Sequence, residues 1–305
     1  MIRRWIPAFA GMTKRGSGNK VAAVAFVALV ACHSAPAPTP ATTAHPTIVS
    51  LNPCSDAILA EVTAPGQLLA ISHFSRDPRS SSMDVARARS LPATGGTVEE
   101  IARLAPDMVV ADSFLPPATA QALRDLGVRV ETVTSPTTVA QSQAQVRHLA
   151  AIAGEPRRGD ALVARIDAAV RRAAPPPGAQ VPALVWEAGG IVAGDGTLIA
   201  DLLAHAGFVN AAAARGLSQA DFLPLERVLA DPPRMIFAVG DPASEEDRSL
   251  RHPALAALWN TRRVPLDGSL LWCGGPTIPR ALDWLAKARA GLSDAIHPSP
   301  EGAGL

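Results

Sequence analysis

Apolar residues along the chain fall into two patterns, short unbroken runs and repeats with helical spacing. The runs at 108–112 (MVVAD) and 234–240 (RMIFAVG) each follow a segment with helical spacing, at 97–104 and 223–230. Short apolar runs bounded by Pro, Gly or Asp are typical of buried strands. The two segments also match residue by residue: Glu99 with Glu226, Pro106 with Pro233, Met108 with Met235 and Ala111 with Ala238. The sequence therefore predicts one helix-to-strand unit that occurs twice.

The same alternation of strand and helix runs along most of the chain. Before the middle, strands are predicted at 47–53, 67–74, 108–112 and 129–133, and helices at 55–66, 97–104 and 117–127. After the middle, strands are predicted at 183–189, 234–240 and 262–267, and helices at 197–207, 223–230, 252–259 and 277–292. Short connections between alternating strands and helices favour mostly parallel sheets covered by helices.

A helix-prone segment separates the two series. Residues 138–173 keep one apolar stripe, and Gly154–Pro156 either kinks a single long helix or separates two helices. The predicted fold class is α/β, with two Rossmann-like β/α lobes joined by a long backbone helix. The predicted boundaries are 47–137 for the N-terminal lobe, 138–174 for the connecting helix, 175–297 for the C-terminal lobe and 298–305 for a disordered tail.

The amino terminus has the pattern of an export signal. Basic residues precede the apolar run 21–31, which is shorter than the roughly 20 residues that span a bilayer. It ends in LVAC (29–32), which resembles a bacterial lipobox with Cys32 as the lipidated residue; an ordinary signal peptide is the alternative. Residues 1–31 are predicted to be cleaved, and the Pro/Ala/Thr-rich 32–46 to form a tether. The true start is either Met1 or Met12.

Composition excludes several function classes. The chain has 305 residues, a net charge of +1 and 18% charged residues, so it lacks the basic footprint of a nucleic-acid binder. It contains no nucleophile elbow, no phosphate-cradling glycine loop and no His-x-x-x-His pair. We therefore predict no catalytic residues, no resident metal and no cofactor. A metal-handling enzyme on the same fold is the weaker alternative.

The order of these features resembles the extracytoplasmic substrate-binding proteins of ABC importers for vitamin B12, ferric siderophores and haem. The resemblance rests on the lipobox, the tether, the two lobes with a helix between them and both glutamate-bearing segments, and it covers about 47–293. It implies a non-enzymatic, monomeric, membrane-anchored periplasmic lipoprotein that holds its ligand in a cleft between the lobes. Its implied partners are a permease dimer with its ATPase subunits and a metal-chelate.

The resemblance also implies roles for the matched glutamates. In the family a glutamate on each lobe docks onto arginines of the permease, and by position these are Glu99 and Glu226. Both also lie where a carboxylate favours a helix amino terminus, so simple stabilisation of the helices is the alternative. Their recurrence at matched positions favours docking.

Ligand in this family lies between the lobes, on loops at strand ends. By sequence order this implies ten ligand-contacting residues: Pro53, Cys54, His73, Phe74, Phe114, Trp186, Phe222, Trp272, Cys273 and Gly274. Trp186 and Trp272 are predicted to pack against a flat ring system, although packing in the lobe core is as good an interpretation of Trp186. Trp259 and Trp284 are predicted to be structural.

The state of Cys54 and Cys273 is left open by the sequence. Cysteines of an exported protein can form a disulfide, here across the lobes, or line the pocket as free thiols, or contact a metal centre together with His73. A cross-lobe bond needs Cα atoms within about 7 Å, and we favour free thiols.

Charge at the predicted ligand loops bears on the choice of chelate. Arg76 and Arg280 are opposed there by Asp112 and Asp221, so the loops are close to neutral. A near-neutral, aromatic-lined site suits cobalamin or a related corrinoid better than an anionic siderophore. Ferric siderophores and haem are the alternatives.

Overall fold

The computed structural model describes residues 45–178, 180–241, 250 and 252–296. The predicted signal peptide, the lipidated Cys32, most of the tether and the predicted tail lie outside these residues. Within the described part, no helix combines the length and the apolar character needed to cross a membrane.

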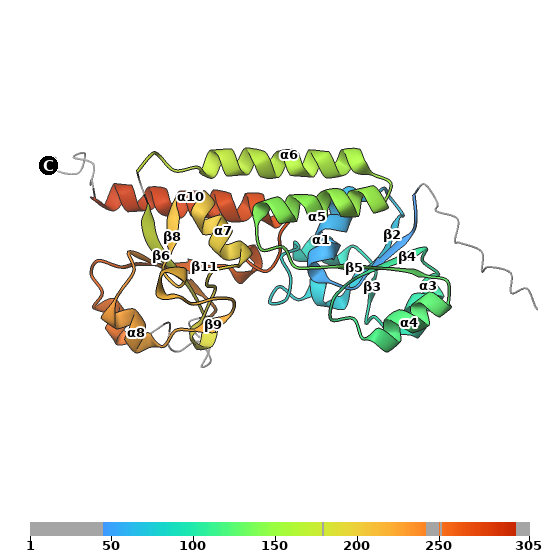
Figure 1. Cartoon of the computed structure of the whole chain (residues 1–305), viewed down its shortest axis with the longest axis horizontal. Coiled ribbons are helices and arrows are strands. Elements are labelled where there is room, and N and C mark those ends of the chain that lie inside the picture. The colour runs from blue at the N-terminus through green and yellow to red at the C-terminus, as the bar shows by residue number, and fades with distance from the viewer. Residues whose placement is uncertain (1–44, 179, 242–249, 251, 297–305) are drawn as a thin grey trace, which may run out of the picture. The chain divides into compact units, whose positions relative to one another are not determined.

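The first lobe is a parallel sheet of five strands in the order β3-β2-β1-β4-β5, flanked by helices (Figure 1). The strands are β1 (Ile48–Ser50), β2 (Leu68–Ser72), β3 (Ala93–Thr94), β4 (Met108–Asp112) and β5 (Arg129–Val133). The helices are α1 (Pro53–Val62), the short 3-10 helix η1 (His73–Arg76), α2 (Val85–Arg89), α3 (Val98–Leu104) and α4 (Pro117–Asp125). Because every strand is parallel, all their carboxyl ends lie at one edge.

The second lobe contains a six-stranded, mostly parallel sheet in the order β11-β10-β6-β7-β9, with β8 paired to β6. Its strands are β6 (Val181–Glu187), β7 (Ile191–Val192), β8 (Phe208–Asn210), β9 (Asp221–Phe222), β10 (Met235–Val239) and β11 (Arg262–Leu266). Its helices are η2 (Ala188–Gly190), α7 (Leu198–His205), η3 (Ala213–Arg215), α8 (Leu225–Ala230), α9 (Pro253–Ala256) and η5 (Gly268–Leu270). The sequence did not predict β7, β8 or β9, which are too short to display a repeat of polar and apolar positions.

The predicted repeat of one helix-to-strand unit is confirmed. In the first copy, the N-cap of α3 is Thr97, whose hydroxyl accepts the backbone N–H of Glu100 at 3.2 Å, and its C-cap is Ala105 in a left-handed conformation. The chain then enters β4, which pairs with β1 and β5. In the second copy, α8 leads into β10, which pairs with β6 and β11. Each copy therefore supplies an inner strand of its sheet.

The predicted helical connection between the lobes consists of two helices. α5 (Val139–Ile152) and α6 (Pro156–Ala173) are separated at Gly154–Glu155 and lie side by side (Figure 1). Their close approach requires glycine, because a Cβ at Gly159 would lie 2.5 Å from the Cβ of Ala150. The 18-residue α6 also packs against α1 and against α10 (Thr277–Ile296), and so contacts elements of both lobes.

One hydrophobic core draws on both sheets and on these helices. It includes β-strand residues such as Ile48 and Phe237, and helix residues such as Val146, Ile166 and Leu282, all of them fully buried. The apolar stripe that the sequence predicted along residues 138–173 therefore packs against both sheets.

A covalent bond adds to this shared core. Cys54, in the first turn of α1, and Cys273, just before α10, form a disulfide with their Cα atoms 5.0 Å apart. Beside it the backbone N–H of Gly275 donates to the Ser142 hydroxyl at 2.7 Å. Of the three alternatives, the disulfide holds and the favoured free thiols were wrong. Because each sulfur is bonded to the other, neither serves as a thiolate ligand.

The two tryptophans predicted to be structural differ. Trp284 packs edge-on against Phe237, with ring centroids 5.4 Å apart, as expected. Trp259 is 88% exposed, so that prediction was wrong. The helix predicted over 252–259 ends at Ala256, so the helical spacing that placed Trp259 on an apolar face does not extend to it.

Removing the disulfide tests its contribution to the fold. Replacing both Cys54 and Cys273 by serine is expected to lower the free energy of unfolding by about 2–5 kcal/mol, because the bond closes a long loop in the unfolded chain. Urea unfolding of the wild type, with and without a phosphine reductant, measures the same quantity. Identical unfolding midpoints for the oxidised protein and the double variant would contradict this.

Candidate ligand-binding site

A pocket lies at the carboxyl edge of the first sheet. Its volume is about 330 Å³, and it lies where β1, β2, β3 and β4 end. The carboxyl edge of a parallel sheet is the usual place for a ligand in α/β proteins. Its lining residues are Leu51, Ser72, His73, Phe74, Thr94, Gly95, Gly96, Ala111, Asp112, Phe114, Leu115, Pro116 and Thr119. The lining combines polar and apolar side chains in similar measure and contains neither arginine nor lysine.

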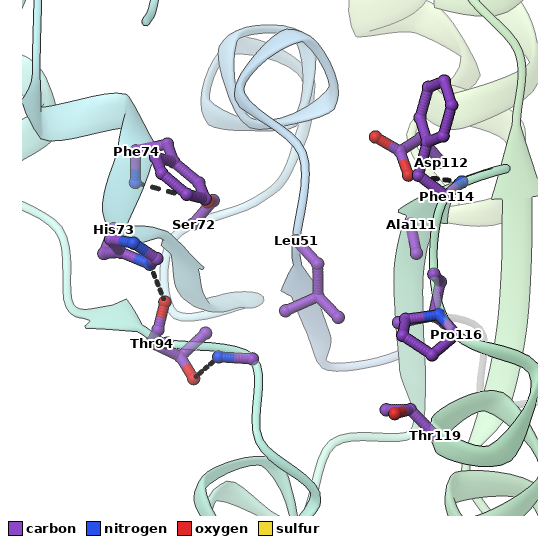
Figure 2. Close-up of a pocket in the computed structure, with 13 residues that line it drawn as sticks. Leu51, Ser72, His73, Phe74, Thr94, Ala111, Asp112, Phe114, Pro116 and Thr119 are labelled. Atoms are coloured by element: carbon purple, nitrogen blue, oxygen red, sulfur yellow. Dashed lines mark hydrogen bonds between the residues drawn. The ribbon is translucent and has the colours of Figure 1, made fainter.

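One wall of the pocket is the turn that follows β2. Ser72 caps this turn, accepting the backbone N–H of Phe74 on its hydroxyl at 3.3 Å. The rings of His73 and Phe74 lie together, with centroids 4.0 Å apart, and His73 Nδ1 lies 3.3 Å from the carbonyl oxygen of Thr94 (Figure 2). That contact leaves the other ring nitrogen of His73 without a protein partner within the described residues. Phe74 is 53% exposed, so its ring offers apolar area to a ligand.

The opposite wall is the turn that follows β4. Asp112 accepts the side-chain amide of Asn52 on Oδ2 at 2.8 Å and the backbone N–H of Phe114 on Oδ1 at 2.9 Å. Its carboxylate therefore fixes the start of the turn and joins it to the N-cap of α1. Phe114 itself is 84% exposed (Figure 2). An aromatic ring exposed to this extent on an anchored turn is well placed to contact a large apolar ligand.

A buried carboxyl group lies behind the first wall. Asp56, in the first turn of α1, is fully buried, and its Oδ2 accepts the backbone N–H of Ser72 at 2.9 Å and the Ser75 hydroxyl at 2.6 Å. The buried hydroxyl of Ser50, at the end of β1, also interacts with this carboxyl group and favours its ionised form. Burial raises the pKa of Asp56 to about 7, because the hydrogen bonds compensate only partly for the lost hydration.

Exposed aromatic residues also occur at the carboxyl edge of the second sheet. Phe222 is 59% exposed and lies against Gly190, where a Cβ would come within 2.7 Å of its ring. Trp272 is 45% exposed and rests on Gly268. At the same edge Glu187 ends β6, and its burial raises the pKa of its carboxyl. This edge therefore combines the aromatic surface of Phe222 and Trp272 with the carboxyl group of Glu187.

The disulfide brings Trp272 close to the first lobe. Trp272 precedes Cys273, which is bonded to Cys54 in the first turn of α1, and the backbone N–H of Cys54 donates to the side-chain oxygen of Asn52 at 2.9 Å. Asn52 in turn holds Asp112 of the pocket. Trp272 is thus linked to Asp112 of the pocket wall through Cys273, the disulfide, Cys54 and Asn52.

Some predicted ligand contacts have little or no exposed surface. Trp186 is 1% exposed in the core of the second lobe, which corrects its assignment to the ligand surface. Successive side chains of β6 point to opposite faces of the sheet, and Trp186 points to the face that is covered by helices of the second lobe. Cys273 and Gly274 are buried beside the disulfide, and Pro53 is the half-buried first residue of α1. His73, Phe74, Phe114, Phe222 and Trp272 remain exposed at the carboxyl edges.

Sequence reasoning missed the polar residues that hold the loops. Asp56 was predicted, with Ser55 as the alternative, only as the cap of the helix over 55–66, but the N-cap of α1 is Asn52. Thr94 falls in the loop 93–96, which was predicted to face the ligand, but its role in holding that loop was not. Within the described residues, no group of three or more His, Cys, Asp or Glu side chains forms a metal site.

Comparison with known proteins gives one family match. The sequence profile of the periplasmic binding protein family matches residues 48–261. No curated protein matches the sequence significantly.

Solved structures share the fold at low sequence identity. The apo haem-binding protein RhuT from Roseiflexus sp. RS-1 is 24% identical with a TM-score of 0.62, covering 82% of this chain and 99% of its own. The haem-binding protein HutB of Vibrio cholerae is 19% identical with a TM-score of 0.66, covering 81% and 99%. The vitamin B12-binding protein BtuF of Vibrio cholerae is 20% identical with a TM-score of 0.60, covering 81% and 97%.

The buried Asp56 predicts how stability depends on pH. Its folded-state pKa of about 7 lies above the ordinary 3.8, so the folded protein binds this proton more tightly and loses stability as pH rises between those values. Compared with Asp56→Asn, the wild type should lose about 3 kcal/mol of unfolding free energy between about pH 5 and pH 8. Urea unfolding of both proteins at the two pH values measures this, and parallel pH profiles would disprove it.

Proposed function

Because the chain belongs to the periplasmic binding protein family, we propose that it captures a corrinoid such as cobalamin and delivers it to an ABC importer. Members of the family bind ligands for transport and work with an importer permease, and they are not enzymes. The observation that carries the choice of ligand is the aromatic, arginine-free and lysine-free pocket at the carboxyl edge of the first sheet.

The size and lining of the pocket support a flat, amide-rich ring. A volume of about 330 Å³ accommodates one edge of a macrocycle, and the exposed rings of Phe222 and Trp272 offer area for the remainder. The polar groups nearby, His73 and Asp112, match a ligand that carries amide donors and acceptors. Proteins that bind carboxylate-rich ligands generally use arginine or lysine, which this pocket lacks.

Acidic groups at the second edge also oppose a polyanionic ligand. Glu187 ends β6 and Asp267 follows β11, and these strands lie on either side of β10 in one register. The carboxylates of Glu187 and Asp267 would repel a ligand that bears several carboxylates or catecholates, but they would not repel a neutral or cationic chelate.

Haem is the second candidate, supported by one specific observation. His73 is exposed at the pocket, and its second ring nitrogen is available to an iron centre. Four of the solved structures that share the fold are described as haem-binding proteins. The propionates of haem would, however, meet the acidic rather than basic groups described above.

Docking to the permease is proposed for Glu99 and Glu226. Both are exposed in the first turn of α3 and α8, and neither makes a hydrogen bond or ion pair within the described residues. The neighbouring Glu100 differs, since its carboxylate accepts the Thr94 hydroxyl and the backbone N–H of Gly95, both at 2.7 Å. Glu100 therefore has the local structural role, and the matched glutamates remain available to a partner.

The cellular form is proposed from the sequence. The lipobox at 29–32 supports a protein that is anchored to a membrane through Cys32 and exposed to the periplasm. We propose separately that the protein acts as a monomer. The tether would then allow the folded part to reach the permease.

Ligand titration tests the proposed function. Cyanocobalamin is expected to quench the fluorescence of Trp272 and to bind at least tenfold more tightly than haemin. Phe114→Ala should weaken cyanocobalamin binding about tenfold by removing aromatic contact area. Leu126→Ala removes another exposed apolar side chain, outside the pocket, and should leave affinity unchanged. Tight binding of haemin with none of cyanocobalamin would refute the corrinoid assignment.

Charge reversal tests the docking proposal. Glu99→Lys combined with Glu226→Lys should leave ligand affinity unchanged and abolish uptake in cells that depend on this importer. Asp125→Lys with Asp160→Lys makes the same change in net charge at other exposed helix positions and should preserve uptake. Normal uptake by the first double variant would show that these glutamates do not dock.

A further inference from the structure

Asp56 contacts the pocket wall at two points while remaining hidden from the pocket itself. One oxygen of its carboxylate, Oδ2, accepts the backbone N–H of Ser72 and the hydroxyl of Ser75. Those two residues bracket His73 and Phe74, whose rings line the pocket. The carboxylate therefore fixes both ends of the segment that carries the two rings.

The helix that carries Asp56 is firmly held. Ile58, Leu59 and Val62 of α1 are buried in the core shared by both lobes, and Cys54 is bonded to Cys273. The turn itself has little apolar support, since His73, Phe74 and Arg76 are all exposed. Polar contacts to this helix, together with those of His73 to the Thr94 carbonyl and of Arg76 to the Leu91 carbonyl, thus hold the turn in place.

The placement of a carboxyl group here is costly. Asp56 is fully buried, and no arginine, lysine or histidine forms an ion pair with it in the described part of the chain. The adjacent Ser55 hydroxyl is buried without a hydrogen-bond partner among the described residues. An apolar residue at position 56 would pack α1 against its neighbours without the free-energy cost of burying a carboxyl group. The aspartate therefore needs a role that compensates for this cost.

We propose that Asp56 is a positioning residue of the ligand site, which holds the His73–Arg76 turn so that His73 and Phe74 face the pocket. The effect on affinity rests on the proposed function, whereas the effect on the turn does not. Because one oxygen accepts both hydrogen bonds, an asparagine can replace the aspartate: its carbonyl accepts the same two donors, and its NH₂ takes the place of Oδ1.

Hydrogen exchange tests the turn directly. In the full-length folded protein, Asp56→Ala should speed exchange of the amides of residues 72–77 about tenfold, because two hydrogen bonds are lost. Asp56→Asn should restore the wild-type rate. Ser75→Ala, which removes one of the two bonds and leaves the carboxyl in place, should give a smaller increase and serves if Asp56→Ala does not fold. Glu61→Ala is the matched control, since Glu61 lies on α1 but pairs with Arg165.

Ligand binding extends the test, with cyanocobalamin and haemin as probes. Asp56→Ala should weaken binding of whichever probe binds the wild type by about tenfold, with Asp56→Asn within twofold of the wild type. If neither probe binds the wild type, the proposed function fails, and hydrogen exchange alone decides the role of Asp56. Unchanged exchange in both Asp56→Ala and Ser75→Ala, or exchange in Asp56→Asn as fast as in Asp56→Ala, would overturn the inference.

Discussion

The shared hydrophobic core around α5, α6 and α10 is the constraint on which the rest of this structure depends. Each lobe packs one face of its sheet against these helices, and residues such as Val146 and Ile166 are fully buried among side chains from both sheets. Packed interiors tolerate little displacement, because separated surfaces lose both contact and burial. The close contact of Gly159 with Ala150 and the disulfide between Cys54 and Cys273 add to this. We therefore expect the lobes to move little relative to one another when ligand binds.

With the sheets held in this way, their carboxyl edges present the loops that carry the proposed binding surface. Each wall of the pocket is fixed by a carboxylate at its base: Asp112 holds the Phe114 turn, and Asp56 holds the His73 turn. Each carboxyl group accepts hydrogen bonds with a defined direction, which suits the positioning of exposed aromatic rings. The rings provide contact area and the carboxylates determine where that area lies.

Part of the site was predictable from residue order. In a parallel sheet the residue after each strand lies at the ligand edge, so His73, Phe74 and Phe114 follow from strand ends alone. Trp186 was misplaced because its position within β6, one residue before the end, directs it into the core. Trp259 was misplaced because α9 ends early. Neither error concerns the fold; each concerns the side or the end of a single element, which apolar spacing specifies poorly.

The sequence by itself determined the two β/α series, the repeated helix-to-strand unit, the break at Gly154–Pro156 and the near-neutral charge, because periodicity, glycine, proline and composition act locally. Only the tertiary structure decided that Cys54 and Cys273 are bonded, that both sheets share one core and that Asp56 supports the pocket. These features join residues far apart in the chain, or depend on burial on one side of a helix. Local patterns carry no information about such distances, which are set when the packed helices bring the chain segments together.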